Sequence, residues 1–172
     1  MDDINVQLKR GRRSWIVAEK CIGVILLLWA IFIFYSVVST MAAMYRSGYM
    51  ATGKITFSSI VFANHFNIII SILCWFGSCL FLYKDRTGWM LCVISSLIFG
   101  ITLFISSRAK ASDSTLSLAN YYKSYGAAAL LFFVIFVLLL LKPIRERYKP
   151  ISKTWLWMAG IVLLALIDKI IF

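Results

Sequence analysis

Long stretches without any charged residue, separated by short clusters of lysine and arginine, constrain this chain more than any other feature. The uncharged stretches cover residues 21–45, 55–83, 87–107, 124–141 and 154–167. An α-helix needs about 20 apolar residues to cross about 30 Å of hydrocarbon. The first three stretches exceed that length and the fourth nearly reaches it. The pattern therefore predicts an all-α fold, a polytopic bundle of transmembrane helices.

Composition leads to the same fold class. Of the 172 residues, 62% are hydrophobic and 15% are charged, whereas a soluble domain is roughly half apolar and a quarter charged. A water-soluble domain of this size could not bury so much apolar surface, so the lipid bilayer is the expected partner. The net charge of +11 does not predict nucleic-acid binding, because the basic residues lie between uncharged stretches rather than along one face.

The last uncharged stretch decides between two versions of the bundle. Residues 154–167 alone would make a helix of about 21 Å, at 1.5 Å per residue, but continuing to Phe172 makes it long enough to cross. We therefore expect a single integral membrane domain with five spans, and the alternative is four spans plus an interfacial C-terminal helix. The expected segments are a basic cytoplasmic tail at 1–19 and spans at about 20–43, 59–83, 88–107, 124–141 and 154–172.

The distribution of lysine and arginine predicts the orientation of these spans. Segments 1–20, 84–86 and 142–153 would share one side and carry twelve of these residues, against six on the other side. Because basic loops stay in the cytoplasm, we expect the N-terminus inside and the C-terminus outside. The cytoplasmic basic loops are then expected to contact anionic lipid headgroups. The charge bias and the few cysteines inside the spans fit a plasma membrane, specifically a bacterial inner membrane.

Aromatic residues near the charged clusters agree with this orientation, because their rings prefer the headgroup level of a bilayer. The residues expected at the cytoplasmic boundary are Trp15, Tyr83, Trp89, Tyr148, Trp155 and Trp157.

Small polar residues recur at helical spacing along the second span. This polar seam, with spacings of 3, 4, 3 and 4, consists of Asn64, Asn67, Ser71, Cys74 and Ser78. The third span carries a similar stripe made of Cys92, Ser95, Thr102 and Ser106. Helices in lipid associate through small residues and hydrogen bonds between helices, so the two stripes indicate a packed contact between the two spans. Ser96 and Gly100, beside the second stripe, are candidate helix-packing residues. The alternative interpretation is a hydrated path lined by asparagine and serine.

Two ionisable residues, His65 and Asp168, are expected at similar depth near the outer boundary. Ionisable groups within a membrane are costly and often mark proton or ion pathways. Three explanations stay open for Asp168. It lies at a plain helix end at the interface, or it pairs with Arg46, Arg108, Lys110 or His65 to hold the last helix, or it takes up protons together with His65.

No motif for catalysis, a cofactor or a metal is present in the sequence. A single histidine excludes a multi-histidine metal site, and none of the four cysteines forms a C-x-x-C pair. We expect a non-enzymatic small integral membrane protein that acts through helix–helix contacts, as an accessory subunit of a membrane complex or as a homo-oligomer. The alternative function is a small oligomeric transporter or channel that uses the polar seam with His65 and Asp168. An intramembrane enzyme is the third class.

Overall fold

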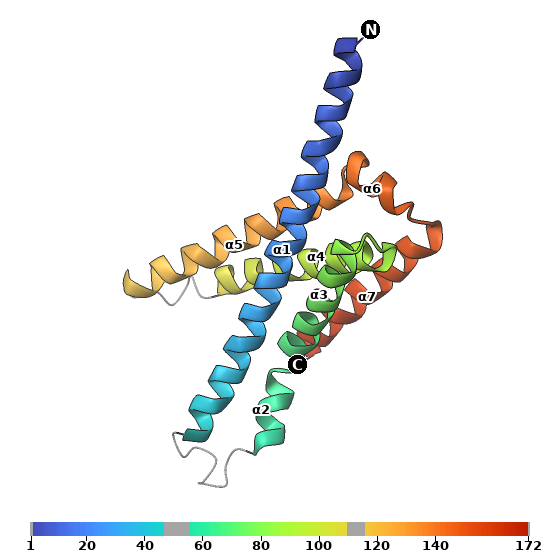
Figure 1. The fold of residues 1–172 in the computed structure, drawn as a ribbon. Coiled ribbons are helices and arrows are strands. Elements are labelled where there is room, and N and C mark those ends of the chain that lie inside the picture. The colour runs from blue at the N-terminus through green and yellow to red at the C-terminus, as the bar shows by residue number, and fades with distance from the viewer. Residues whose placement is uncertain (1, 47–55, 110–115, 172) are drawn as a thin grey trace.

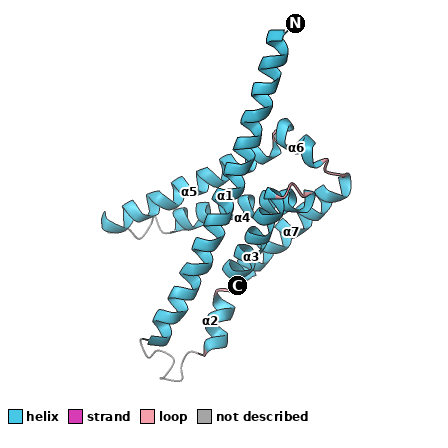
Figure 2. Cartoon of the chain, viewed as in Figure 1, coloured by secondary structure: helices cyan, strands magenta, loops and turns pink. Residues whose placement is uncertain are grey.

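The computed structural model describes residues 2–46, 56–109 and 116–171, and all the regular secondary structure in these ranges is α-helical (Figure 1 and Figure 2). The helices are α1 (Asp2–Arg46), α2 (Phe57–Ala63), α3 (His65–Leu82), α4 (Arg86–Ala109), α5 (Leu116–Leu140), α6 (Lys142–Tyr148) and α7 (Ser152–Ile171).

Among the described residues, three helical segments are long and apolar enough to cross a membrane. They are Ser14–Arg46, His65–Leu82 and Arg86–Ser107. A fourth is obtained if Tyr125–Leu140 and Lys142–Tyr148, which meet at a bend of 62°, count as one span. The fifth expected span corresponds to α7, and α7 is not among the helices that meet this criterion of length and apolarity. The part of the chain that the structure describes is therefore all-helical, with three to four helices suited to a bilayer.

The turn between α3 and α4 makes a tight antiparallel hairpin. Lys84 adopts a left-handed conformation with φ of 64°. The amide of Asp85 donates to the carbonyl of Leu80 at 3.0 Å, and the amide of Lys84 donates to that of Phe81 at 2.9 Å. This pair of bonds is a Schellman motif, which satisfies the last carbonyls of α3. A side chain at Gly88 would place its Cβ 2.2 Å from the amide nitrogen of Phe81, so the hairpin requires glycine there.

This hairpin joins two helix pairs that diverge. α1 packs along α3, and α5 packs along α4. In Figure 1, α1 and α3 run toward the bottom of the view while α4 and α5 run to the left. α7 crosses the hairpin and contacts α4 and α3. The two pairs thus form a fork whose base is the α3–α4 turn.

Three segments differ from the expected layout. The expected span 59–83 is interrupted at Asn64, which separates α2 from α3 and whose side-chain amide donates to the carbonyl of Ile60 at 3.0 Å. The expected connection 142–153 contains α6, which begins beside a proline because proline suits the first turn of a helix. Helix α1 begins at Asp2, so the basic tail continues the first span as helix.

The core combines aliphatic and aromatic side chains, and it includes two residues expected at the membrane boundary. Trp89 is fully buried, and its indole N–H donates to the carbonyl of Leu139 at 3.0 Å. The Tyr148 ring is also buried and stacks against Phe81 and Trp89. Both rings therefore face the protein interior, and for Tyr148 the bend before α6 turns the ring inward.

Candidate functional site

The polar seam divides into two halves with different surroundings. Its deep half, Ser71, Cys74 and Ser78, is buried between α1 and α4. The hydroxyls of Ser71 and Ser78 donate to carbonyls of their own helix at 2.6 and 2.7 Å, and the Cys74 thiol donates to the carbonyl of Leu26 on α1 at 3.5 Å. Each polar group is satisfied by protein, so this half is packed.

The open half of the seam, Asn64 and Asn67, lines a cavity of about 340 Å³. We call it the fork cavity, because it lies where the α1–α3 pair separates from α4 and α5. Its polar lining comes from α1, from the start of α3 and from α4, and consists of Ser36, Thr40, Asn64, Asn67, Thr102 and Ser106. Tyr125 and Lys169 also reach it. The stripe on α4 is divided in the same way, because its other members, Cys92 and Ser95, are buried.

The candidate packing residues Ser96 and Gly100 both lie on α4, and their surroundings differ. Ser96 is fully buried, and its hydroxyl donates to the carbonyl of Val93 at 3.0 Å. A Cβ at Gly100 would lie 3.1–3.3 Å from the ring of Phe133, so this glycine faces α5 rather than α3. The close approach between α3 and α4 occurs instead at Gly77, where a Cβ would lie 2.6 Å from that of Leu91.

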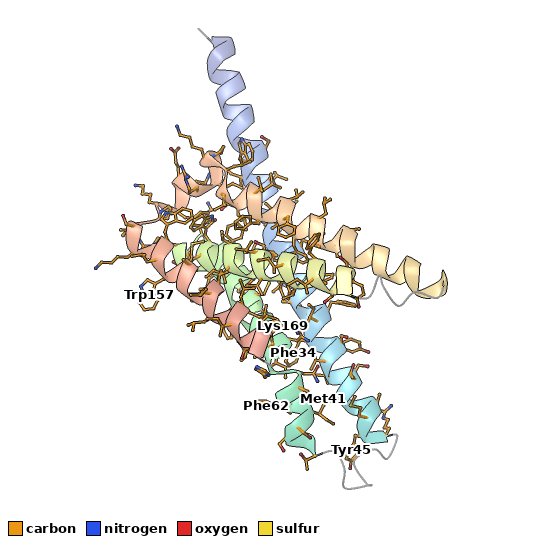
Figure 3. All side chains as sticks on the ribbon, turned by 180° about the vertical axis from the view of Figure 1, so that it is seen from behind. Phe34, Met41, Tyr45, Phe62, Trp157 and Lys169 are labelled. Atoms are coloured by element: carbon orange, nitrogen blue, oxygen red, sulfur yellow. The ribbon has the colours of Figure 1, made fainter. Side chains whose placement is uncertain are left out.

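His65 and Asp168 lie in contact. Nε2 of His65 is 3.0 Å from Oδ2 and 3.1 Å from Oδ1 of Asp168. Nδ1 of His65 contacts the carbonyl oxygen of Phe62, and the Phe62 ring stacks on the imidazole at 5.1 Å. The side chains of His65 and Asp168 are 23% and 34% exposed, and the pair joins the start of α3 to the end of α7. The next residue, Lys169, is labelled near the end of α7 in Figure 3. Its Nζ lies 5.4 Å from the centre of the Phe66 ring.

A second ionic contact was not foreseen from the sequence. Glu19 on α1 is only 5% exposed, although it is acidic. Arg147 of α6 donates to its carboxylate at 2.6 Å, and the hydroxyl of Tyr148 donates to its other oxygen. We call these three residues the Glu19 cluster. The available sequence signal was an isolated acidic residue at the start of an apolar stretch, which needs a cation when it is buried.

The chemistry open to these groups is narrow. Within the described residues, no three histidine, cysteine, aspartate or glutamate side chains gather closely enough to hold a metal ion. The four cysteines are free thiols, and two of them, Cys74 and Cys92, are buried. The arrangement offers a histidine–carboxylate pair at one end of α3 and a polar cavity beside it.

The fold and these contacts define an all-helical protein suited to a membrane, with ionic contacts between its helices. Comparisons with protein-family models, with curated proteins and with solved structures give no match to this chain.

Proposed function

We propose that this protein is a non-enzymatic integral membrane protein that acts through helix–helix contacts, as an accessory subunit of a membrane complex or as a homo-oligomer. The observation that carries the proposal is the packed deep half of the polar seam. Ser71, Cys74 and Ser78 are buried and satisfied by protein, which favours a structural seam over a hydrated path.

The proposal includes five spans, with the N-terminus in the cytoplasm of a bacterial cell and the C-terminus outside. The contacts of α7 support a fifth span. Near its start, Trp155 packs edge-on against Trp89 at the beginning of α4, with ring centres 5.9 Å apart. Near its end, Asp168 reaches His65 at the beginning of α3. α7 therefore runs from the level of the α3–α4 turn to the level of the start of α3, and Lys169 can extend its amine toward the headgroups.

Contacts with anionic lipid headgroups on the cytoplasmic side are also part of the proposal. A pocket of about 270 Å³ lies between the starts of α4 and α7. Its lining contains the cations Arg86 and Lys153, the hydroxyls of Thr87 and Thr154, and the ring of Trp157. Basic pockets between helices at this level suit phosphate groups of lipids.

Reporter-fusion topology mapping tests the span number and orientation. Tags would be placed at the C-terminus and within 107–125 and 142–153. We expect the C-terminal tag and the 107–125 tag to report outside and the 142–153 tag to report inside. A C-terminal tag that reports inside would leave four spans and an interfacial α7.

Thiol labelling separates a packed seam from the alternative function, a transporter or channel. In a variant that keeps Cys74 as its single cysteine, we expect this thiol to resist a small water-soluble thiosulfonate reagent when the protein is in membranes. A cysteine in place of Asn67, about two helical turns away in the open half, should react and serves as the positive control. Fast labelling of Cys74 would mean that water reaches the deep half, and the transporter with His65 and Asp168 would then be the better proposal.

A further inference from the structure

The fork cavity has the properties of a binding site for a small amphiphile. It has a volume of about 340 Å³, at the lower end of the range for small-molecule pockets. Five helical regions contribute to its wall: α1, the α2–α3 junction with the start of α3, α4, α5 and the end of α7. Each is placed by contacts away from the cavity, so the cavity is a property of the fold.

The floor of the cavity is aromatic. Trp29 packs edge-on against Phe99 and lies 5.7 Å from the ring of Phe32, and all three rings line the cavity. These rings form an apolar surface that would accommodate the chain of an amphiphile.

The rest of the wall contains both apolar and polar side chains and carries one positive charge. Lys169 is the one charged residue among the described residues that line the cavity. The carboxylate of the neighbouring Asp168 is paired with the imidazole of His65, whose Nε2 lies 3.0 Å from Oδ2 of Asp168. The side-chain amides of Asn64 and Asn67 also line the cavity, whereas the hydroxyl of Thr102 donates to carbonyls of its own helix. This side of the cavity therefore suits a negatively charged head that pairs with Lys169 and accepts hydrogen bonds from side-chain amides.

We propose that the fork cavity binds an amphiphile with an acyl chain and an anionic head, with the head against Lys169 and the chain on the rings of Trp29, Phe32 and Phe99. A free fatty acid and an anionic phospholipid share this chemistry. The site is distinct from the cytoplasmic pocket at Arg86 and Lys153, and it does not depend on the number of spans or on a protein partner.

Bromine quenching of tryptophan fluorescence tests the site directly. The full-length protein in detergent would be titrated with a brominated fatty acid, a brominated phosphatidylglycerol and a brominated fatty alcohol. We expect saturable quenching by the acids, which Trp29→Phe removes. Trp75→Phe is the matched control, because Trp75 is a 48% exposed residue on α3 that does not line the cavity, and this variant should keep the saturable component. Saturation by the fatty acid but not by the phospholipid would identify the free acid as the ligand.

Substitution of Lys169 tests the predicted position of the head. Lys169→Gln should weaken binding of the brominated acid about tenfold, the change expected from losing about 1.4 kcal/mol, and should leave the alcohol unaffected. Lys169→Arg should retain acid binding, and it keeps the test decisive if Trp29→Phe does not fold. Decanoate should compete with the brominated acid, and inorganic phosphate should not. Quenching that never saturates, or that is equal in Trp29→Phe and Trp75→Phe, or that Lys169→Gln does not change, would overturn the proposal.

Discussion

Two ionic contacts hold opposite ends of this molecule, and they differ in burial. In the Glu19 cluster, the carboxylate side chain is 7% exposed and has two protein donors, Arg147 and Tyr148. In the other contact, His65 and Asp168 are 23% and 34% exposed. A buried charge depends strongly on its partner, whereas water can replace the partner of a half-exposed one.

The two contacts also differ in the permanence of their charge. The guanidinium of Arg147 is charged at any accessible pH, so the link between α1 and α6 does not switch. The imidazole of His65 can be neutral or protonated, so the link between α3 and α7 is an ion pair only when the ring carries its proton. The comparison indicates that α1 and α6 form a fixed part of the bundle and that α7 is attached more weakly.

The largest effect should follow from breaking the Glu19 cluster. We expect Glu19→Leu to lower the free energy of unfolding by about 2–3 kcal/mol, because the charge of Arg147 loses its partner. This is below the roughly 3–5 kcal/mol for a fully buried pair, because Arg147 remains 27% exposed. The measurement is unfolding of the purified protein in mixed micelles.

The matched control is Glu146→Leu, which breaks the exposed contact between Glu146 and Lys142 at 3.8 Å on the same short helix α6. We expect a change of at most about 0.5 kcal/mol for this pair. Equal effects of the two substitutions would contradict the assignment of the Glu19 cluster as the stronger link.

A smaller effect is expected from overfilling the deep half of the polar seam. Ser71→Leu adds volume to a buried contact and should cost about 1–3 kcal/mol of the free energy of unfolding. Asn67→Leu, at an exposed position one turn earlier on the same face of α3, should change it by less than about 0.5 kcal/mol. A cost for Asn67→Leu that matched or exceeded that of Ser71→Leu would mean that the two halves do not differ in packing.

The smallest effect on global stability is expected from Asp168→Asn. The contact with His65 is partly exposed and lies near the end of α7, so its loss should loosen α7 without unfolding the rest. Hydrogen–deuterium exchange should rise in α7 and stay unchanged in α1, and the melting temperature should fall less than in Glu19→Leu. Asp85→Asn, at an exposed position in the α3–α4 turn, is the control. Exchange that rose equally in α1 and α7 would show that the pair holds the whole bundle.

The sequence was informative where the deciding physics is local. Uncharged length and charge clusters predicted apolar helices, and the 3–4 spacing placed the seam residues on one face of the second span. Spacing along one helix defines a face but not the depth to which neighbours cover it. It could therefore not separate Ser71, covered by α1 and α4, from Asn67, which faces the fork cavity.

Of the two ionic contacts between distant segments, the sequence indicates one and gives no comparable signal for the other. His65 and Asp168 were expected in one layer because both fall near the same boundary of their spans, and they lie 3.0 Å apart. The Glu19 cluster had no comparable signal. Arg147 was counted as an ordinary loop cation, and only the 62° bend after α5 brings it and Tyr148 back to α1.

The separation of Glu19 from Arg147 along the chain also has a consequence in time. The two residues are 128 positions apart, and ribosomes add about 5–20 residues per second. Glu19 therefore emerges roughly 6–26 s before its cation, by the same rate. During that interval the carboxylate of Glu19, at the start of the first apolar stretch, has no Arg147 with which to pair. Closure of the Glu19 cluster is thus a late step of biosynthesis, and it marks a chain whose preceding helices have all been made.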